Sequence, residues 1–187
     1  GGGPRDEILL LTRSLKEKAY SGGSDRELLF ADVIQAVIKR RLSHSVWTCL
    51  PKFSGLSEDV WRDATTKPTF IREFWPSQIL LGQRGLLLGK SAVVQMPTSV
   101  GKTRAMELII RSAFLAERTS LALVVAPFRA LCHEIHVSLS HQFKGEDVDV
   151  EVASDVLQED VSFADESHIL ILTPEKLEFL LRHNEGL

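Results

Sequence analysis

Apolar residues recur every three or four positions in the N-terminal part of the chain, which is the spacing of amphipathic helices. This pattern predicts one helix over residues 4–20 and a second helix that begins at Ser24, where Glu27 completes a capping box. We expect each helix to bury one apolar stripe. The stripes consist of Ile8, Leu11, Leu15 and Ala19 in the first helix, and of Phe30, Val33, Ile34, Val37 and Ile38 in the second.

The next stretch holds two connectors and one short helix. Residues 50–55 contain Pro, Ser and Gly and are predicted to form a loop, and residues 65–68 form a second connector. The helix between them spans Ser57 to Ala64. We place a domain boundary at the second connector. Residues 1–68 are then a helical accessory region, and residues 69–187 form a second unit.

Strands and helices alternate from Phe70 onward. A helix over residues 79–88 precedes a predicted strand from Ala92 to Gln95, and a run of helix formers extends from Arg104 to about Glu117. Three further apolar segments are predicted strands, each followed by a loop or helix. They are Leu121–Val125, which we expect to be covered on both faces, Val148–Ala153 and His168–Leu172, with helices from Pro127 to about Phe143 and after Thr173. Such alternation is typical of an α/β fold with a parallel sheet.

Composition narrows the class of protein. Hydrophobic residues make up 44% of the chain, which favours a globular protein, and the net charge of −3 provides no bulk attraction for nucleic acid. Cys49 and Cys132 are far apart and lack the spacing of a zinc site, so two reduced cysteines in a cytoplasmic protein are expected. No apolar run is long enough to predict a membrane span.

The segment from Met96 to Thr103, with the letters MPTSVGKT, lies between the first predicted strand and a predicted helix. Strand, loop and helix in this order are the context of a phosphate-binding loop, where backbone N–H groups and a helix N-terminus face a polyphosphate. The usual pattern has Gly or Ala where Met96 stands, so a chance Gly-Lys-Thr is the alternative. The predicted nucleotide-binding residues are Thr98, Ser99, Val100, Gly101, Lys102 and Thr103.

Three side chains of this loop have distinct expected roles with ATP and Mg²⁺. Gly101 lets the backbone approach a phosphate closely. Lys102 is the predicted catalytic residue, because its ammonium group can reach the terminal phosphates. Thr103 is the predicted metal ligand through its hydroxyl group.

Four motifs occur together in one order. They are Pro76-Ser77-Gln78, the MPTSVGKT segment, Pro127 to Leu131 with the letters PFRAL, and Thr173 to Leu177 with the letters TPEKL. In this order and spacing the chain from about Phe70 resembles the first RecA-like domain of superfamily-two helicases of the DExH/DEAD type, with the Ski2-like and Hel308-like enzymes as the nearest kind. The earlier residues resemble no family that we can name.

The resemblance implies an ATP-dependent nucleic-acid helicase or translocase. Gln78 would bind adenine through its amide, which can both donate and accept. The loops at Pro127, Arg129, Thr173 and Pro174 would hold the backbone of one DNA or RNA strand without reading its sequence. Phe74 and Trp75 could stack on the base, but we expect both to pack in the core. The N-terminal helices are candidates for binding a protein partner.

A second match to the family's letters is rejected. Asp165 and Glu166 begin a DExH sequence, but they precede an apolar strand, whereas the acidic box of the family follows one. They also precede the TPEKL motif. The resemblance therefore implies that the true acidic box lies beyond Leu187, and that these residues are the N-terminal part of a larger enzyme and do not hydrolyse ATP by themselves.

Two other functions fit the loop less well. A P-loop enzyme of another class, such as a small-molecule kinase or a GTPase, would not require the TPEKL motif. A non-catalytic interaction module would use the N-terminal helices and keep the phosphate loop only as a remnant.

Overall fold

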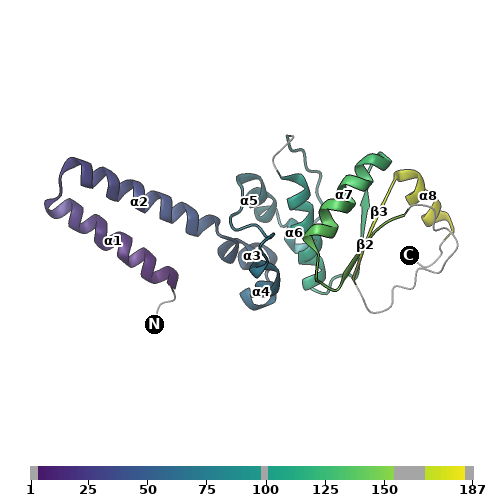
Figure 1. The fold of residues 1–187 in the computed structure, drawn as a ribbon, viewed down its shortest axis with the longest axis horizontal. Helices are drawn as coiled ribbons and strands as arrows, with labels where there is room; N and C mark the ends of the chain where they lie inside the picture. The colour runs from purple at the N-terminus through teal and green to yellow at the C-terminus, as the bar shows by residue number, and fades with distance from the viewer. Residues whose placement is uncertain (1–3, 98–100, 154–166, 184–187) are drawn as a thin grey trace.

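The structure is a computed structural model that describes residues 4–97, 101–153 and 167–183. A helical hairpin extends from a cluster of short helices, which in turn lies beside a parallel sheet with its own helices (Figure 1). No described helix is both long and apolar enough to span a membrane. The architecture confirms the predicted α/β fold of a partial RecA-like domain preceded by a small helical region.

The hairpin consists of α1 (Pro4–Gly22) and α2 (Asp25–His44). Its turn is closed by the N–H of Gly23, which donates to the carbonyl of Ala19 at 2.8 Å. The predicted capping box is confirmed, because the N–H of Ser24 donates to a carboxylate oxygen of Glu27 at 2.7 Å and Ser24 caps α2 in return. The end of α1 and the start of α2 are therefore set by local contacts.

The predicted burial of the two apolar stripes is wrong for most of their residues, although Ala19 is buried as predicted. Between the two helices the buried residues are Thr12, Ala19 and Ala31. Most stripe residues are exposed. Two packed helices bury only the line along which they touch, and no other described element lies over the side of the hairpin that carries the stripes. The exposed stripe residues are Ile8, Leu11 and Leu15 of α1, and Phe30, Val33, Ile34 and Val37 of α2.

The predicted loop at residues 50–55 is also wrong. Residues Val46–Ser54 form α3, with Pro51 inside it, and Glu58–Thr66 form α4 after the cap Ser57. Pro51 costs one helical hydrogen bond, but burial of apolar side chains on both sides of it outweighs that loss. The core of this region joins residues from both sides of position 68. It contains Val46, Cys49, Leu50, Phe53, Trp61, Ala64, Phe70, Phe74, Leu87 and Leu108.

The sheet has three parallel strands in the order β1-β3-β2, which confirms three of the predicted strands. They are β1 (Leu121–Val125), β2 (Val148–Val152) and β3 (Ser167–Leu172), and Leu123 pairs with Leu170 across β1 and β3. Helices α6 (Lys102–Leu115), α7 (Arg129–Gln142) and α8 (Pro174–His183) accompany them. The second core lies between the sheet and its helices, with Ile110, Val124, Cys132, Leu139, Phe143, Ile169 and Ile171 among its buried residues.

The predicted strand from Ala92 to Gln95 is not formed. These residues have no regular structure and are exposed, and no described strand lies beside them to complete a hydrogen-bonded ladder. The same edge of the sheet leaves Leu123 and Val125 of β1 exposed, so the prediction that this strand is covered on both faces is wrong. Upstream, the predicted helix over 79–88 is divided into α5 (Pro76–Gln83) and a 3₁₀ turn (Leu86–Leu88) that ends at Gly89.

A buried charge network joins α6 to the rest of the molecule. Arg111 of α6 is only 2% exposed, and it donates to a carboxylate oxygen of Glu107 at 3.1 Å and to the carbonyl of Gln142 at 3.2 Å. Arg111 also pairs with Glu146, which in turn pairs with Lys67. Since an unpaired charge at this depth would be costly, the network fixes how α6 lies against α7 and the helical region.

Gly82 allows the closest contact between α5 and α3, and it provides a test of this packing. A Cβ atom at this position would lie 2.4 Å from the ring of Phe53. We expect Gly82→Ala to lower the free energy of unfolding by about 1–3 kcal/mol through overpacking. Gly22→Ala is the matched control, because nothing lies within 4 Å of its added Cβ and alanine is the better helix former. Urea unfolding followed by circular dichroism measures both, and equal stability of the two variants would contradict the packing.

Candidate nucleotide and nucleic-acid sites

The start of α6 carries the described part of the phosphate loop. Gly101 precedes the helix with φ of 82° and ψ of 38°, a left-handed conformation that favours glycine. The first helical hydrogen bond runs from the N–H of Ala105 to the carbonyl of Gly101 at 2.9 Å. Lys102 is exposed and Thr103 is half-buried. The helix thus presents at its N-terminus backbone N–H groups without an intrahelical acceptor and one ammonium group, which is the chemistry that a phosphate group requires.

Three of the predicted nucleotide-binding residues lie outside the described residues. They are Thr98, Ser99 and Val100, which form the middle of the loop. The rejected acidic pair, Asp165 and Glu166, also lies outside them. The predictions made for these five residues therefore stay predictions.

Gln78 lies directly against the loop. Its side chain is 3% exposed, and its carbonyl oxygen accepts a hydrogen bond from the N–H of Trp75 at 2.9 Å, which caps α5. Its amide nitrogen lies 3.4 Å from the position that a Cβ of Gly101 would occupy. The sequence alternatives were an adenine ligand or a surface polar residue, and the second is wrong. Gln78 is a buried contact between α5 and the phosphate loop.

Trp75 corrects a further prediction. Phe74 is buried in the core as expected, but Trp75 is 54% exposed. Its six-membered ring lies 3.8 Å from the position of a Cβ on Gly101. A large aromatic surface is therefore open to solvent within contact distance of the phosphate loop. The sequence signal for this was the position of Trp75, directly before the helix that holds Gln78.

An apolar cavity of about 500 Å³ adjoins the same loop. It lies between α6 and the open edge of β1, next to the residues that were predicted to form a strand. Among the described residues that line it, Lys102 is the one that carries a charge, and the others include Val94, Met96, Met106, Ile109 and Leu123. An apolar cavity of this kind suits the side chains of a covering element better than a charged ligand.

The second predicted site is at the C-terminal ends of the strands. The N–H of Ala126 donates to the carbonyl of Leu172 at 2.9 Å, which holds the ends of β1 and β3 together. Arg129 at the start of α7 and Thr173 before α8 then line one cavity of about 190 Å³. Pro127 and Pro174 are exposed beside it.

Two charged residues of this cavity region were missed from the sequence. Lys176 lines the cavity and donates to the carbonyl of Ala153 at the end of β2. Its place in the first turn of α8, three residues after Thr173, was the available signal. Glu175 is beside Thr173, and hydrogen bonds from its own backbone N–H and from the Thr173 hydroxyl lower the pKa of its carboxyl group. The cavity therefore carries two cations and has one carboxylate near its rim.

The parallel strands bring the two sites to one edge. The starts of α6, α7 and α8 all lie at the carboxyl ends of the strands, which is the upper edge in Figure 1. Open α/β sheets bind ligands at this edge. Among the described residues no group of three or more His, Cys, Asp or Glu could hold a metal ion.

Comparison with known proteins agrees with this geometry. A family model described as DEAD/DEAH box helicase matches residues 80–187, which is more than half of the chain. The chain belongs to the DEAD/DEAH box helicase family. A curated protein, Hachiman protein HamB of Bacillus cereus, is 32% identical over 120 residues, which are 63% of this chain and 11% of HamB. The chain thus spans about a tenth of the length of this relative.

The left-handed backbone of Gly101 restricts which residues can stand at this position of the loop. We expect Gly101→Ala to lower the free energy of unfolding by about 1–2 kcal/mol, because an L-residue is strained at this φ. Gly145→Ala is the matched control, since Gly145 has φ of 76° and no atom within 4 Å of an added Cβ. Only Gly101→Ala should also change the fluorescence of Trp75, whose ring lies beside it. Identical fluorescence spectra for both variants and the wild type would contradict the contact between loop and indole.

Proposed function

We propose that this chain forms part of the first motor domain of an ATP-dependent nucleic-acid helicase or translocase. The observation that carries the proposal is the convergence of Arg129 and Thr173 on one cavity, at the sheet edge where α6 also begins. Membership of the helicase family supports it, and the small share of HamB that is matched supports a larger parent protein. Assignment to the Ski2-like or Hel308-like group stays a prediction.

Nucleotide binding is assigned to the start of α6. Lys102 would neutralise the terminal phosphates, and the open N–H groups of the first turn would donate to their oxygens. Gly101 fits this role because a side chain there would fill the space between the loop and Gln78. Bound Mg²⁺-ATP would supply the reactive phosphoryl group, and Thr103 would bind its metal ion through the hydroxyl group.

The base of the nucleotide is assigned to the side of the loop where α5 begins. Trp75 offers an exposed ring there, which suits stacking on adenine. Gln78 would approach the base with its amide nitrogen and with the second lone pair of its oxygen, because the first already accepts from the N–H of Trp75. The sequence prediction, in which the amide uses both of its ends, therefore stays a prediction.

Nucleic acid is assigned to the cavity at the ends of β2 and β3. A phosphate there would meet Arg129, the Thr173 hydroxyl and the N-terminus of α8, none of which reads a base. Glu175 opposes binding because its carboxylate competes for the same hydroxyl. Binding should therefore be weak, independent of sequence and sensitive to salt, whether the strand is DNA or RNA.

The nucleotide assignment predicts a large effect of Lys102. Lys102→Ala should weaken ATP binding by about 10–100-fold in the full-length helicase, since one charge-assisted contact to phosphate is worth about 1.5–3 kcal/mol. Isothermal titration with ATP measures this. Lys39→Ala, an exposed lysine of the hairpin, is the control and should leave the affinity unchanged. An unchanged affinity of the Lys102→Ala variant would exclude the phosphate role.

The nucleic-acid assignment predicts a change in salt dependence. Arg129→Ala should reduce the slope of log affinity against log salt by about one for single strands of any sequence. Fluorescence anisotropy with labelled oligonucleotides between low and moderate salt measures this slope. Arg182→Ala, at the far end of α8 and paired with Glu178, should leave the slope unchanged. An effect of Arg129→Ala confined to one base sequence would argue against backbone binding.

A further inference from the structure

We propose that the exposed apolar flank of the α1–α2 hairpin binds the same flank of a second copy of this chain, so that two hairpins form an antiparallel four-helix bundle. The proposal concerns the helical region and does not depend on the nucleotide or nucleic-acid sites. It begins from the stripes that the sequence predicted to be buried and that the structure leaves open.

The two flanks of the hairpin differ sharply in chemistry. A helix turns by about 100° per residue, so relative to the buried Thr12 the side chains of Arg13 and Lys16 turn to one flank, and those of Leu11 and Leu15 turn to the other. Relative to the buried Ala31, Asp32 and Gln35 turn to the first flank. By the same geometry Phe30 and Ile34 of α2 share the second flank with Leu11 and Leu15 of α1.

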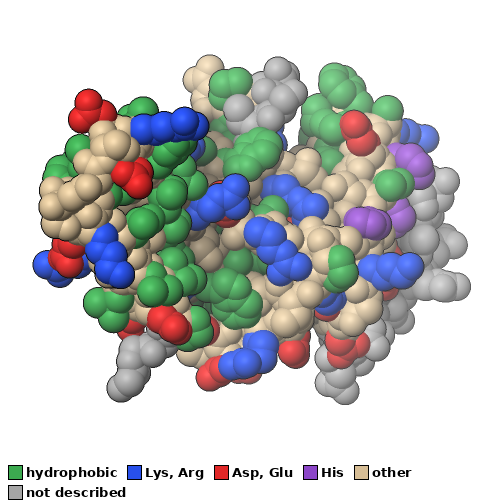
Figure 2. All heavy atoms as spheres, turned by 60° about the vertical axis from the view of Figure 1, so that its left-hand side comes forward, with side chains coloured by type: hydrophobic (Ala, Val, Ile, Leu, Met, Phe, Trp, Pro, Cys, Tyr) green, Lys and Arg blue, Asp and Glu red, His purple; other side chains and the backbone are tan. Residues whose placement is uncertain are grey.

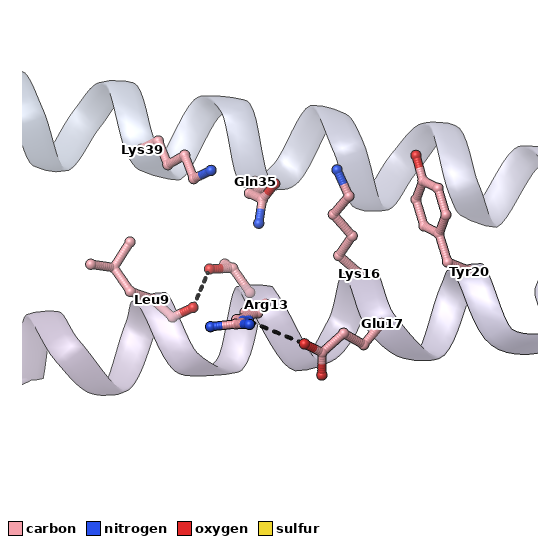
Figure 3. A pocket seen from close by; sticks show the side chains of 8 residues that line it. Leu9, Arg13, Lys16, Glu17, Tyr20, Gln35 and Lys39 are labelled. Atoms are coloured by element: carbon pink, nitrogen blue, oxygen red, sulfur yellow. Dashed lines mark hydrogen bonds and ion pairs between the residues drawn. The ribbon is translucent and has the colours of Figure 1, made fainter.

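The first flank is a polar groove suited to water (Figure 3). Leu9, Arg13, Lys16, Glu17, Tyr20, Gln35 and Lys39 line it, with the helices α1 and α2 on its two sides. The ammonium group of Lys16 lies 2.8 Å from a carboxylate oxygen of Asp32, and the hydroxyl of Tyr20 donates to the same carboxylate at 2.8 Å. These contacts of Lys16 and Tyr20 lower the pKa of Asp32. The charge of Asp32 is therefore balanced by partners within the hairpin.

The second flank is apolar along most of its length. Leu11 is 63% exposed and Phe30 is 51% exposed, and they continue with exposed side chains on both helices. These are Ile8, Leu15, Ile34 and Val37. Hydrophobic side chains are correspondingly prominent on the hairpin end that comes forward in Figure 2. A contiguous patch of this kind is typical of an interaction surface.

The size of the flank suits a dimer of hairpins. Helix α1 has 19 residues, so it is about 28 Å long, and two helices side by side are about 20 Å wide. The resulting face is of the same order as the roughly 800 Å² per partner of a standard interface. Two such hairpins give the layer of apolar positions that the core of a four-helix bundle requires.

Charges at the two ends of the flank make it self-complementary. Glu7 and Arg41 lie at the end nearest the short helices, and Lys18 and Glu27 lie at the end nearest the turn between α1 and α2. We place the two-fold axis in the plane of the flank and perpendicular to the helices. Each helix of the second copy then lies over the same helix of the first copy and runs in the opposite direction. This arrangement places Glu7 against Lys18 of the second copy, once at each end of the bundle, and Ile34 meets its own copy near the axis. Arg41, which pairs with Glu73 at 3.2 Å, faces Glu27 of the second copy, whose carboxylate accepts from Ser24. Opposite charges therefore meet at both ends, which selects a second copy as the occupant.

Space for the partner exists where the flank meets the rest of the molecule. A cavity of about 380 Å³ lies between α2 and residues 73–76. Val37, Arg41 and Trp75 are among the residues that line it. With the two-fold axis described above, the interhelix turn of the second copy would be directed toward this cavity.

The test is the association state of the 187-residue chain by sedimentation equilibrium between about 1 and 200 μM. The wild type should double its mass with concentration, whereas Ile34→Arg should remain monomeric over the same range, since it places two cations on the axis. Leu10→Arg is the matched control, because Leu10 is 67% exposed but points away from both flanks, and it should dimerise like the wild type. Circular dichroism should give the same helix content for all three. A monomeric wild type, or a dimeric Ile34→Arg variant, would overturn the proposal.

Exchanging the charges of Glu7 and Lys18 tests the arrangement in which the two-fold axis is perpendicular to the helices. Glu7→Lys or Lys18→Glu alone should weaken dimerisation by about 3–30-fold at low salt, because two attractive pairs per dimer become repulsive. The double variant Glu7→Lys/Lys18→Glu should return to within about twofold of the wild type. A double variant weaker than either single variant would contradict this arrangement, since Glu7 would then face Arg41 of the second copy instead of Lys18.

Discussion

The buried guanidinium of Arg111 is the constraint on which the arrangement of the described chain depends. A charge that is 2% exposed must be paired where it lies, because leaving it unpaired costs several kcal/mol. Its partners come from separate parts of the sequence, namely Glu107 in α6, the carbonyl of Gln142 at the end of α7, and Glu146. The ring of Phe143 adds a face 4.2 Å from the guanidinium carbon. Helix α6 therefore has one position in which all of these contacts are made.

Fixing α6 also fixes the chemistry at its start. Glu107, which accepts from Arg111, also accepts at 2.8 Å from Arg104, which lies two residues after Lys102. The network continues through Glu146 to Lys67 in the connector after α4. The helical region, the sheet and the N-terminal end of α6 are thus held by one set of charges. A change of position at Lys102 on nucleotide binding would have to be absorbed by this set, which gives the short helices a physical route to respond to the nucleotide.

Local signals were sufficient to predict much of the fold. The capping residues Ser24 and Glu27, the apolar strands and the loops that carry Arg129 and Thr173 depend on neighbours in sequence or on the rule that parallel strands end at one edge. Pro51 misled the prediction because burial of α3 was decided by Trp61 and Phe74, which are distant in sequence. The segment from Ala92 to Gln95 has the residues of a strand, but a strand also needs a neighbour, and its own sequence cannot say whether one is beside it. The roles of Trp75 and Lys176 depended on which side chains the fold leaves at the surface, and no periodicity reports that.

The hairpin also shows the difference between what a local sequence pattern predicts and what depends on distant neighbours. An apolar stripe on a helix predicts that something covers it, but it does not say whether the cover is the same chain or another one. In α1 and α2 the facing residues Thr12, Ala19 and Ala31 are small enough to let the helices approach, and the large residues Leu11, Leu15, Phe30 and Ile34 are left on one flank. A hairpin of two helices cannot bury both its contact line and such a flank. Because the flank ends beside Trp75, whose ring lies against the phosphate loop, whatever covers it would also come close to the proposed nucleotide site. Assembly through the hairpin and binding at the loop would then act on the same residues, and each would change the affinity of the other by the same factor.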